Sequence, residues 1–302
     1  MSFKVIQRKY LIYLGEKQMN KFKMEVVLIK GLKKILEFFP LALRFKFAEF
    51  LGMLTYYVIK KRRSLTYENL KIAFPEKSMK ELKKIAKESY KTVAKNTFIP
   101  LFLTELIEKK AIETDNIQLA KELYGRGKGL ILTTLHMGGF EAGFSLAKWF
   151  DVYTVFKKQK NPYLNNLMTS YREKTGAKTI LKNVENGSNE KISECFRNKG
   201  LLILASDQYS NGVDIEFFGR STKANEGNIL LAMKYKAPIV LAYSVFKKDR
   251  INITFVKELE IEKIGKLRET LQYNTQKLFY DFEELIKKYP EQYMWQHNRW
   301  KI

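Results

Sequence analysis

The stretch from Gly129 to Glu141 reads GLILTTLHMGGFE and indicates the fold of this chain. Its first seven residues are a run without charge, and His136 follows directly after that run. Two similar runs occur at residues 200–206 (GLLILAS) and 238–246 (PIVLAYSVF). Continuous apolar runs separated by helix-like stretches are typical of buried strands in a mostly parallel sheet.

Helix-like stretches separate these runs and complete the predicted layout. Apolar spacing predicts helices at residues 116–123, 140–149, 162–175, 188–198, 226–236 and 266–288. A capping box, Ser78-x-x-Glu81, predicts a further helix that runs to about Tyr90. We therefore predict an α/β fold with a mostly parallel central sheet flanked by helices. Residues 1–110 are expected to form an N-terminal helical arm at a membrane interface, and residues 111–302 an α/β domain.

The first 63 residues carry much of the positive charge of the chain. They hold 15 basic and 4 acidic side chains, a net charge of +11 out of +23 for all 302 residues. Apolar clusters alternate there with lysines, with a break near Pro40, which favours interfacial helices at residues 20–61. A helical hairpin packed on the core, with its lysines in solvent, would give the same pattern. The longest run without a charged residue is 12 residues, at 129–140, whereas a membrane-spanning helix needs roughly 18.

Composition excludes several kinds of protein. Hydrophobic residues make up 45% of the chain, too many for a disordered protein. Cys195 is the only cysteine, which excludes an internal disulfide, and the only histidines are His136 and His297, so we expect no metal site. The first 20 residues contain scattered charges and do not resemble a signal peptide. The net charge favours a polyanionic partner, but no basic stripe with interleaved aromatic residues indicates specific nucleic-acid binding.

Two of the predicted strands end in ionisable side chains, His136 and Asp207. Ligands of open α/β sheets bind beyond the carboxyl ends of the strands. Histidine suits general-base catalysis near neutral pH, and Glu141 is close enough in sequence to orient the ring and stabilise the imidazolium. Gly138 and Gly139 allow the backbone to approach a ligand, and nearby N–H groups then face an oxyanion. Alternatively, His136 caps a turn and Glu141 only interacts with the helix dipole.

Four sequence blocks, in this order, resemble the late acyltransferases of lipid A biosynthesis, a family of the lysophospholipid acyltransferase superfamily. The blocks are NLKIAFPEKS (69–78), HMGGFE (136–141), Asp207-Gln208 followed by FFG (217–219) and Gly227, and YPEQYMWQHNRW (289–300). The resemblance runs from about Leu41 to Trp300. The His block is common to many acyltransferases, whereas the C-terminal block is far more specific.

The resemblance implies transfer of a fatty acyl group from a thioester to a hydroxyl of a membrane glycolipid, without a cofactor or a covalent acyl-enzyme. His136 would take the proton of the hydroxyl, and Glu141 would orient and charge-stabilise its ring. Arg172 and the backbone N–H groups of residues 138–140 are our hypothesis for stabilising the tetrahedral intermediate. Asp207 would organise the site at the strand end, or it only caps a loop.

Substrate binding is expected at Gln208, Phe218 and Arg220, where Arg220 either contacts a phosphate or lies in solvent. The family implies an acyl carrier protein or acyl-CoA as donor, a lipid A precursor as acceptor, and the cytoplasmic face of the inner membrane as location, in peripheral or monotopic form. An acidic carrier, an anionic leaflet and a phosphorylated acceptor all suit a basic protein. Two alternatives remain open: a lysophospholipid or phosphatidylinositol mannoside as acceptor, and a catalytically inactive membrane-binding scaffold.

Overall fold

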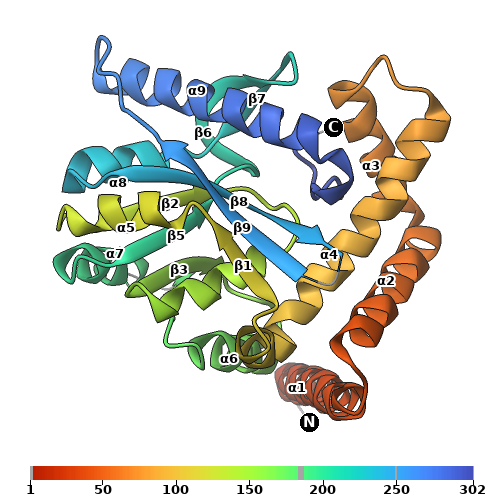
Figure 1. Cartoon of the computed structure of the whole chain (residues 1–302). Coiled ribbons are helices and arrows are strands. Elements are labelled where there is room, and N and C mark those ends of the chain that lie inside the picture. The colour runs from red at the N-terminus through yellow and green to blue at the C-terminus, as the bar shows by residue number, and fades with distance from the viewer. Residues whose placement is uncertain (1–2, 183–186, 249, 302) are drawn as a thin grey trace.

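The computed structural model describes residues 3–182, 187–248 and 250–301, with side chains from residue 18 on. Its centre is a seven-stranded sheet with the order β1-β9-β8-β2-β5-β3-β4 (Figure 1). All neighbouring pairs are parallel except β8 and β9, so the predicted α/β fold is confirmed. The strands are β1 (Ile112–Asp115), β2 (Leu130–Thr134), β3 (Val152–Lys157), β4 (Lys178–Lys182), β5 (Leu201–Ala205), β8 (Ile239–Lys247) and β9 (Arg250–Glu258).

The three strands predicted from apolar runs, β2, β5 and β8, lie side by side at the centre of this sheet. Every residue of β2 is buried. A strand covered on both faces needs apolar residues throughout, which is why its sequence is a continuous run. Polar residues interrupt the other four strands of the sheet, β1, β3, β4 and β9. A search for continuous apolar runs therefore does not predict them. The same holds for a separate antiparallel pair, β6 (Tyr209–Phe217) and β7 (Arg220–Ala224).

Helices cover both faces of the sheet. On one face α7, α8 and α9 share a core with Ile131 of β2, and on the other face α5 and η1 share a core with Leu130 and Leu132. Residues 140–149 are helical as predicted, but η1 is a 3-10 helix. These elements are α5 (Ile117–Gly125), η1 (Phe140–Lys148), α6 (Pro162–Glu173), α7 (Gly187–Arg197), α8 (Gly227–Tyr235), α9 (Leu267–Lys288) and η2 (Pro290–Gln292).

The N-terminal part of the chain is helical as predicted. It contains α1 (Phe3–Glu37), α2 (Leu41–Val58), α3 (Lys60–Ala73) and α4 (Met79–Glu108), with the expected break at Pro40. The capping box is present, since Glu81 Oε2 accepts a hydrogen bond of 2.8 Å from the N–H of Ser78. However, α4 continues far beyond the expected end at Tyr90 and bends at Phe102, two residues after its internal proline.

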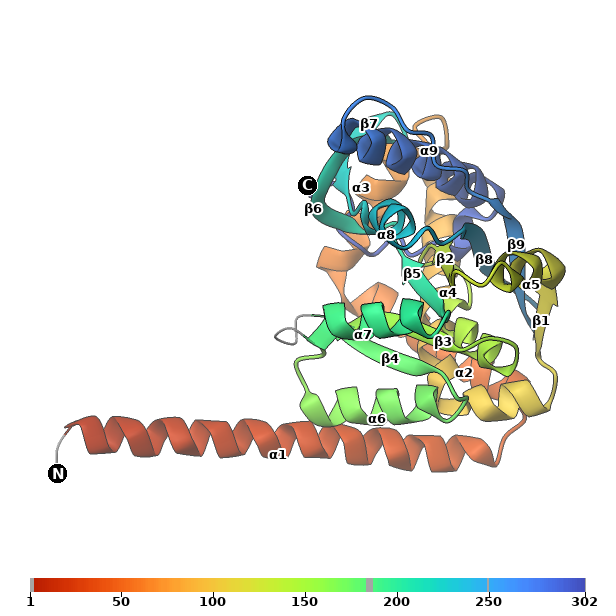
Figure 2. The same cartoon turned by 90° about the vertical axis from the view of Figure 1, so that its left-hand side faces the viewer.

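Helix α1 lies along α6, and its N-terminal part extends well beyond the body of the protein (Figure 2). The side-chain amide of Asn161, which begins α6, donates to the carbonyl of Phe22 at 3.0 Å and to the carboxylate of Glu25 at 2.8 Å. No helix within the described ranges is both long and apolar enough to cross a membrane.

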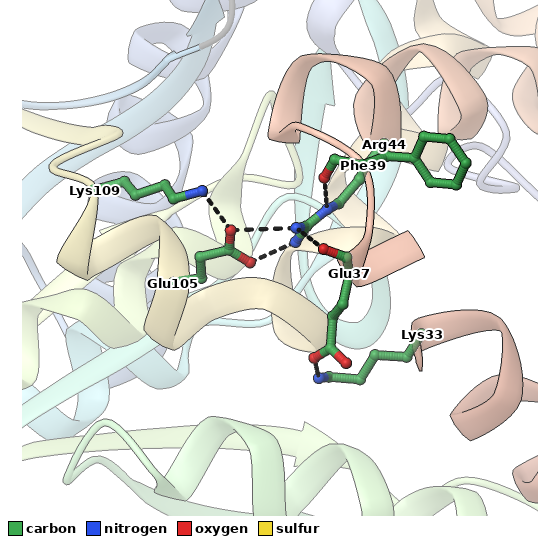
Figure 3. Close-up of polar contacts among 6 residues, drawn as sticks. All are labelled: Lys33, Glu37, Phe39, Arg44, Glu105 and Lys109. Atoms are coloured by element: carbon green, nitrogen blue, oxygen red, sulfur yellow. Dashed lines mark hydrogen bonds and ion pairs between the residues drawn. The ribbon is translucent and has the colours of Figure 1, made fainter. Parts of the chain in front are cut away.

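The buried side chain of Arg44 binds both the turn between α1 and α2 and helix α4 (Figure 3). Its guanidinium donates to the carbonyls of Phe39 at 2.7 Å and Glu37 at 3.1 Å, and it pairs with the carboxylate of Glu105. Lys109 binds the same carboxylate at 2.7 Å. Arg44 therefore binds the last carbonyl of α1 and one carbonyl of the following turn, and links both to α4.

Candidate active site

His136 and Asp207 form a pair at the carboxyl ends of two neighbouring strands. Since β2 and β5 are parallel and in register from Leu130 to Thr134, the residues that follow them lie side by side. Asp207 Oδ1 accepts hydrogen bonds from the His136 ring at Nδ1, 2.7 Å away, and from its backbone N–H at 3.0 Å. The carboxylate is 1% exposed, whereas the ring is 20% exposed. One carboxylate oxygen thus fixes both the backbone and the ring, and leaves Nε2 for chemistry.

The two groups shift each other's pKa in opposite directions. Burial raises the pKa of Asp207, but the charge of His136, its two hydrogen bonds and one from Tyr293 together lower that pKa below its usual value. Burial lowers the pKa of His136, but the charge and hydrogen bond of Asp207 outweigh burial and raise that pKa above 6.5. His136 is therefore a stronger base than an ordinary histidine.

The C-terminal block of the sequence holds the loop that carries His136. Met294 donates its N–H to the carbonyl of His136 at 3.0 Å, and Gly138 donates its N–H to the carbonyl of Gln292 at 2.8 Å. Gly138 has a φ of +54°, and a Cβ at this position would lie 2.1 Å from the carbonyl oxygen of Ser244. Only glycine fits this turn. Because the two hydrogen bonds join the loop to the C-terminal block, the distant blocks HMGGFE and YPEQYMWQHNRW form one structural unit.

The described structure has no hydrogen bond between Glu141 and the ring of His136, so the expected orienting contact is not seen, although the charge of Glu141 raises the pKa of that ring. The carboxylate of Glu141 instead pairs with Arg172 through two hydrogen bonds, at 3.0 Å to Nε and 2.5 Å to Nη2. The physical reason is that η1 begins after Gly139 and carries Glu141 toward α6, whereas β5 ends beside His136. The guanidinium of Arg172 also lies over the ring of Phe156, 4.0 Å from its centroid. Two of its donor groups are thus used within the protein.

A cavity of about 480 Å³ adjoins the His136–Asp207 pair. Its aromatic and aliphatic lining includes Phe140, Phe144, Val155, Phe156, Ile203, Leu204, Ala205 and Tyr209, and its polar lining includes His136, Glu141, Lys157, Lys182, Ser206, Gln208 and His297. The wall therefore combines apolar side chains with many polar and charged ones, which suits a ligand with both an apolar chain and a polar head.

The structure brings some of the predicted binding residues to this cavity and not others. Gln208 lines it. Phe218 lies in the turn between β6 and β7, where it packs against Phe74 and donates its N–H to Glu283 at 2.7 Å. Arg220 begins β7 and is exposed. Neither Phe218 nor Arg220 lines the cavity.

The cavity wall includes His297, Lys157 and Lys182, none of which was among the predicted catalytic or binding residues. The carbonyl of His297 accepts a hydrogen bond of 2.7 Å from Asn69, and its buried Nε2 has no hydrogen-bond partner among the described residues. Burial lowers the pKa of His297 to about 4, so its ring is neutral near pH 7. The available signal was its place in the C-terminal block, as one of only two histidines.

Within the described residues, no group of three or more His, Cys, Asp or Glu side chains could hold a metal ion.

In a comparison with known families, residues 17–302 match the family model described as bacterial lipid A biosynthesis acyltransferase. This stretch includes all the cavity residues named above. A comparison with curated proteins gave no match.

Proposed function

Since the chain belongs to the bacterial lipid A biosynthesis acyltransferase family and is therefore an acyltransferase, we propose that it transfers a fatty acyl chain from an acyl thioester to a hydroxyl of a lipid A precursor. The observation that carries this proposal is the His136–Asp207 pair beside a cavity with aromatic and aliphatic walls. The pair supplies a base, and the cavity suits an acyl chain.

The proposed reaction begins with the neutral ring of His136. Its Nε2 takes the proton of the acceptor hydroxyl while the hydroxyl oxygen attacks the carbonyl carbon of the thioester. The tetrahedral intermediate then breaks its carbon–sulfur bond, and the leaving thiolate takes the proton from the imidazolium. An ester and a free thiol result, without a covalent acyl-enzyme. Asp207 stabilises the imidazolium between the two steps.

We assign the oxyanion of the intermediate to the backbone N–H groups of Gly139 and Phe140. The N–H of Gly138 is already donated to Gln292, and Arg172 uses Nε and Nη2 for Glu141. In this proposal the Glu141–Arg172 pair shapes the cavity wall and adds negative charge near His136. Burial lowers the pKa of the His136 ring, and the charge and hydrogen bond of Asp207 raise it. The charge of Glu141 raises it further, by a smaller amount.

We further propose that an acyl carrier protein presents the thioester, with acyl-CoA as the alternative donor. The formal charge of +23 supports an acidic donor protein and an anionic lipid surface. Together with the family, this charge supports a location at the cytoplasmic face of the inner membrane.

An exposed apolar surface on the arm supports membrane association. It consists of Met24, Val27, Leu28 and Ile35 of α1, of Phe38 and Phe39 in the following turn, and of Leu43, Phe50, Leu54, Tyr57 and Val58 of α2. Lysines flank it, as in proteins that lie in a membrane interface. In flotation with anionic liposomes, Phe38→Ser/Phe50→Ser should bind less tightly than the matched exposed pair Leu267→Ser/Tyr280→Ser. Unbound wild-type protein at low salt would contradict this part of the proposal.

The reaction itself is tested with purified protein, acyl carrier protein thioesters and a panel of acceptors. The acceptors are a lipid A precursor, a lysophospholipid and a mannosylated phosphatidylinositol, and His136→Ala is the control. Acylation of the lipid A precursor alone, abolished in His136→Ala, is the expected result. A different preferred acceptor would replace the substrate proposal, and wild-type protein that acylates nothing would favour the scaffold function.

A further inference from the structure

Two lysines lie side by side on the wall of the cavity. Lys157 ends β3 and Lys182 ends β4, and the two are direct partners in the register of these parallel strands. Partners in a parallel pair point to the same face of the sheet, with neighbouring strands about 4.8 Å apart. Both side chains line the cavity that contains His136.

This arrangement places two positive charges next to each other on the cavity wall. Like charges directly opposite each other on neighbouring strands are destabilising. Neither lysine has an ion-pair or hydrogen-bond partner among the residues described on either side of positions 183–186. By contrast, Lys178 at the other end of β4 binds Asp151 at 2.9 Å and the hydroxyl of Tyr153 at 2.7 Å. Among the described residues, the two lysines beside the cavity thus lack an ion-pair partner, and an anion there would offset their repulsion.

We propose that Lys157 and Lys182 bind a phosphate group of one of the two substrates, an inference that rests on the proposed acyl transfer. A phosphate offers several oxygens to two separate ammonium groups and carries up to two negative charges, which suits point charges such as lysine. The source is a phosphate of the acceptor glycolipid or the phosphate of the donor's phosphopantetheine arm.

The position of this subsite makes it an anchor away from the reacting atoms. The strand order places β3 two strands from β2, and β4 three strands from it. At about 4.8 Å per strand, the lysines lie roughly 10–14 Å to the side of the strand that precedes His136. Binding energy from such a remote group positions the reacting hydroxyl and thioester.

The test compares Lys157→Gln/Lys182→Gln with Lys158→Gln/Lys160→Gln. The control pair loses the same two charges from exposed positions nearby that do not line the cavity. Initial rates are measured with the acceptor and its dephosphorylated form, and with acyl-phosphopantetheine and acyl-pantetheine. Wild type and control should prefer one phosphorylated substrate by about tenfold or more in kcat/KM, and the cavity variant should lose this preference. The substrate whose preference disappears identifies the source of the phosphate.

A binding measurement separates failure of this inference from failure of the proposed function. Calorimetric titration with inorganic pyrophosphate, at fixed ionic strength, requires no turnover. Affinity about tenfold lower in the cavity variant than in the control supports the subsite, even if wild type transfers no acyl chain. Equal affinity in all three proteins, equal losses in both variants, or an undiminished phosphate preference in the cavity variant would overturn the inference.

Discussion

Replacement of Asp207 by asparagine tests the part of the mechanism that depends most on the structure. Asparagine has nearly the same shape, so the hydrogen bond to the backbone N–H of His136 is kept while the negative charge is lost. At 2.7 Å between Oδ1 and Nδ1, the attraction between full charges is about 6 kcal/mol at an effective dielectric constant of about 20. The amide dipole retains part of this stabilisation. We therefore expect the imidazolium to lose about 4 kcal/mol, which lowers kcat about 10³-fold.

The pH dependence gives a second readout of the same substitution. The base must be neutral, so the wild-type rate should rise through the pKa of His136, above 6.5. In Asp207→Asn the acid limb should move to lower pH because the charge that raises this pKa is gone. Asp214→Asn, which removes an exposed carboxylate paired with Lys223, is the matched control. A tenfold or smaller loss of kcat with an unmoved acid limb would refute the assigned role of Asp207.

The other predictions concern separate contacts. Arg172→Lys keeps the positive charge but loses the two-point pairing with Glu141. We expect kcat/KM, measured by acyl-transfer rates, to fall about tenfold. The free energy of unfolding, measured by urea titration, should fall by about 1–2 kcal/mol. Arg44→Met should lower the unfolding free energy by about 2–4 kcal/mol, against less than about 0.5 kcal/mol for the exposed Lys46→Met, in the same titration. His297→Gln should weaken substrate binding but leave the acid limb of the pH–rate profile in place, because His297 with a pKa of about 4 is already neutral there. The pKa of Asp207 is lower in the folded protein than in the unfolded chain, so its contribution to stability is complete above about pH 4. The pKa of His136 is raised on folding, so its contribution is complete below about pH 6.5. Their mutual stabilisation is therefore fully present only between about pH 4 and 6.5. The destabilisation by Asp207→Asn should therefore be larger at pH 5 than at pH 9; equal values would contradict this linkage.

Sequence alone predicts the centre of the sheet because burial on both faces leaves a local signature. The runs that became β2, β5 and β8 contain few polar residues, so a short window suffices. The sequence KTILK of β4 has no such signature, since this edge strand has exposed and buried positions. The capping box marks where α4 begins, but no comparable signal marks its end, and the helix continues past Tyr90 and bends after Pro100.

The sequence places His136 and Asp207 at strand ends, but it does not predict that they pair. The apolar runs locate those strand ends. Which carboxylate reaches the ring depends on β5 lying beside β2, although about 70 residues separate them in sequence, and no local pattern encodes such a neighbour. Glu141 is closer in sequence but belongs to η1, whose 3-10 geometry directs it to Arg172. The pairing of Lys157 with Lys182 likewise follows only from the register of two strands.

Helix α6 lies between the arm and the cavity beside His136. At its beginning Asn161 accepts hydrogen bonds from the first turn of α6 and donates two to α1. In its last turn Arg172 binds Glu141 and covers Phe156 on the cavity wall. These 12 residues span about 18 Å as a rigid rod. Since α6 lies along α1 (Figure 2), an α1 that lies on a bilayer as proposed would place α6 between the lipid surface and the cavity. The long arm would then position the acceptor for catalysis as well as anchor the protein.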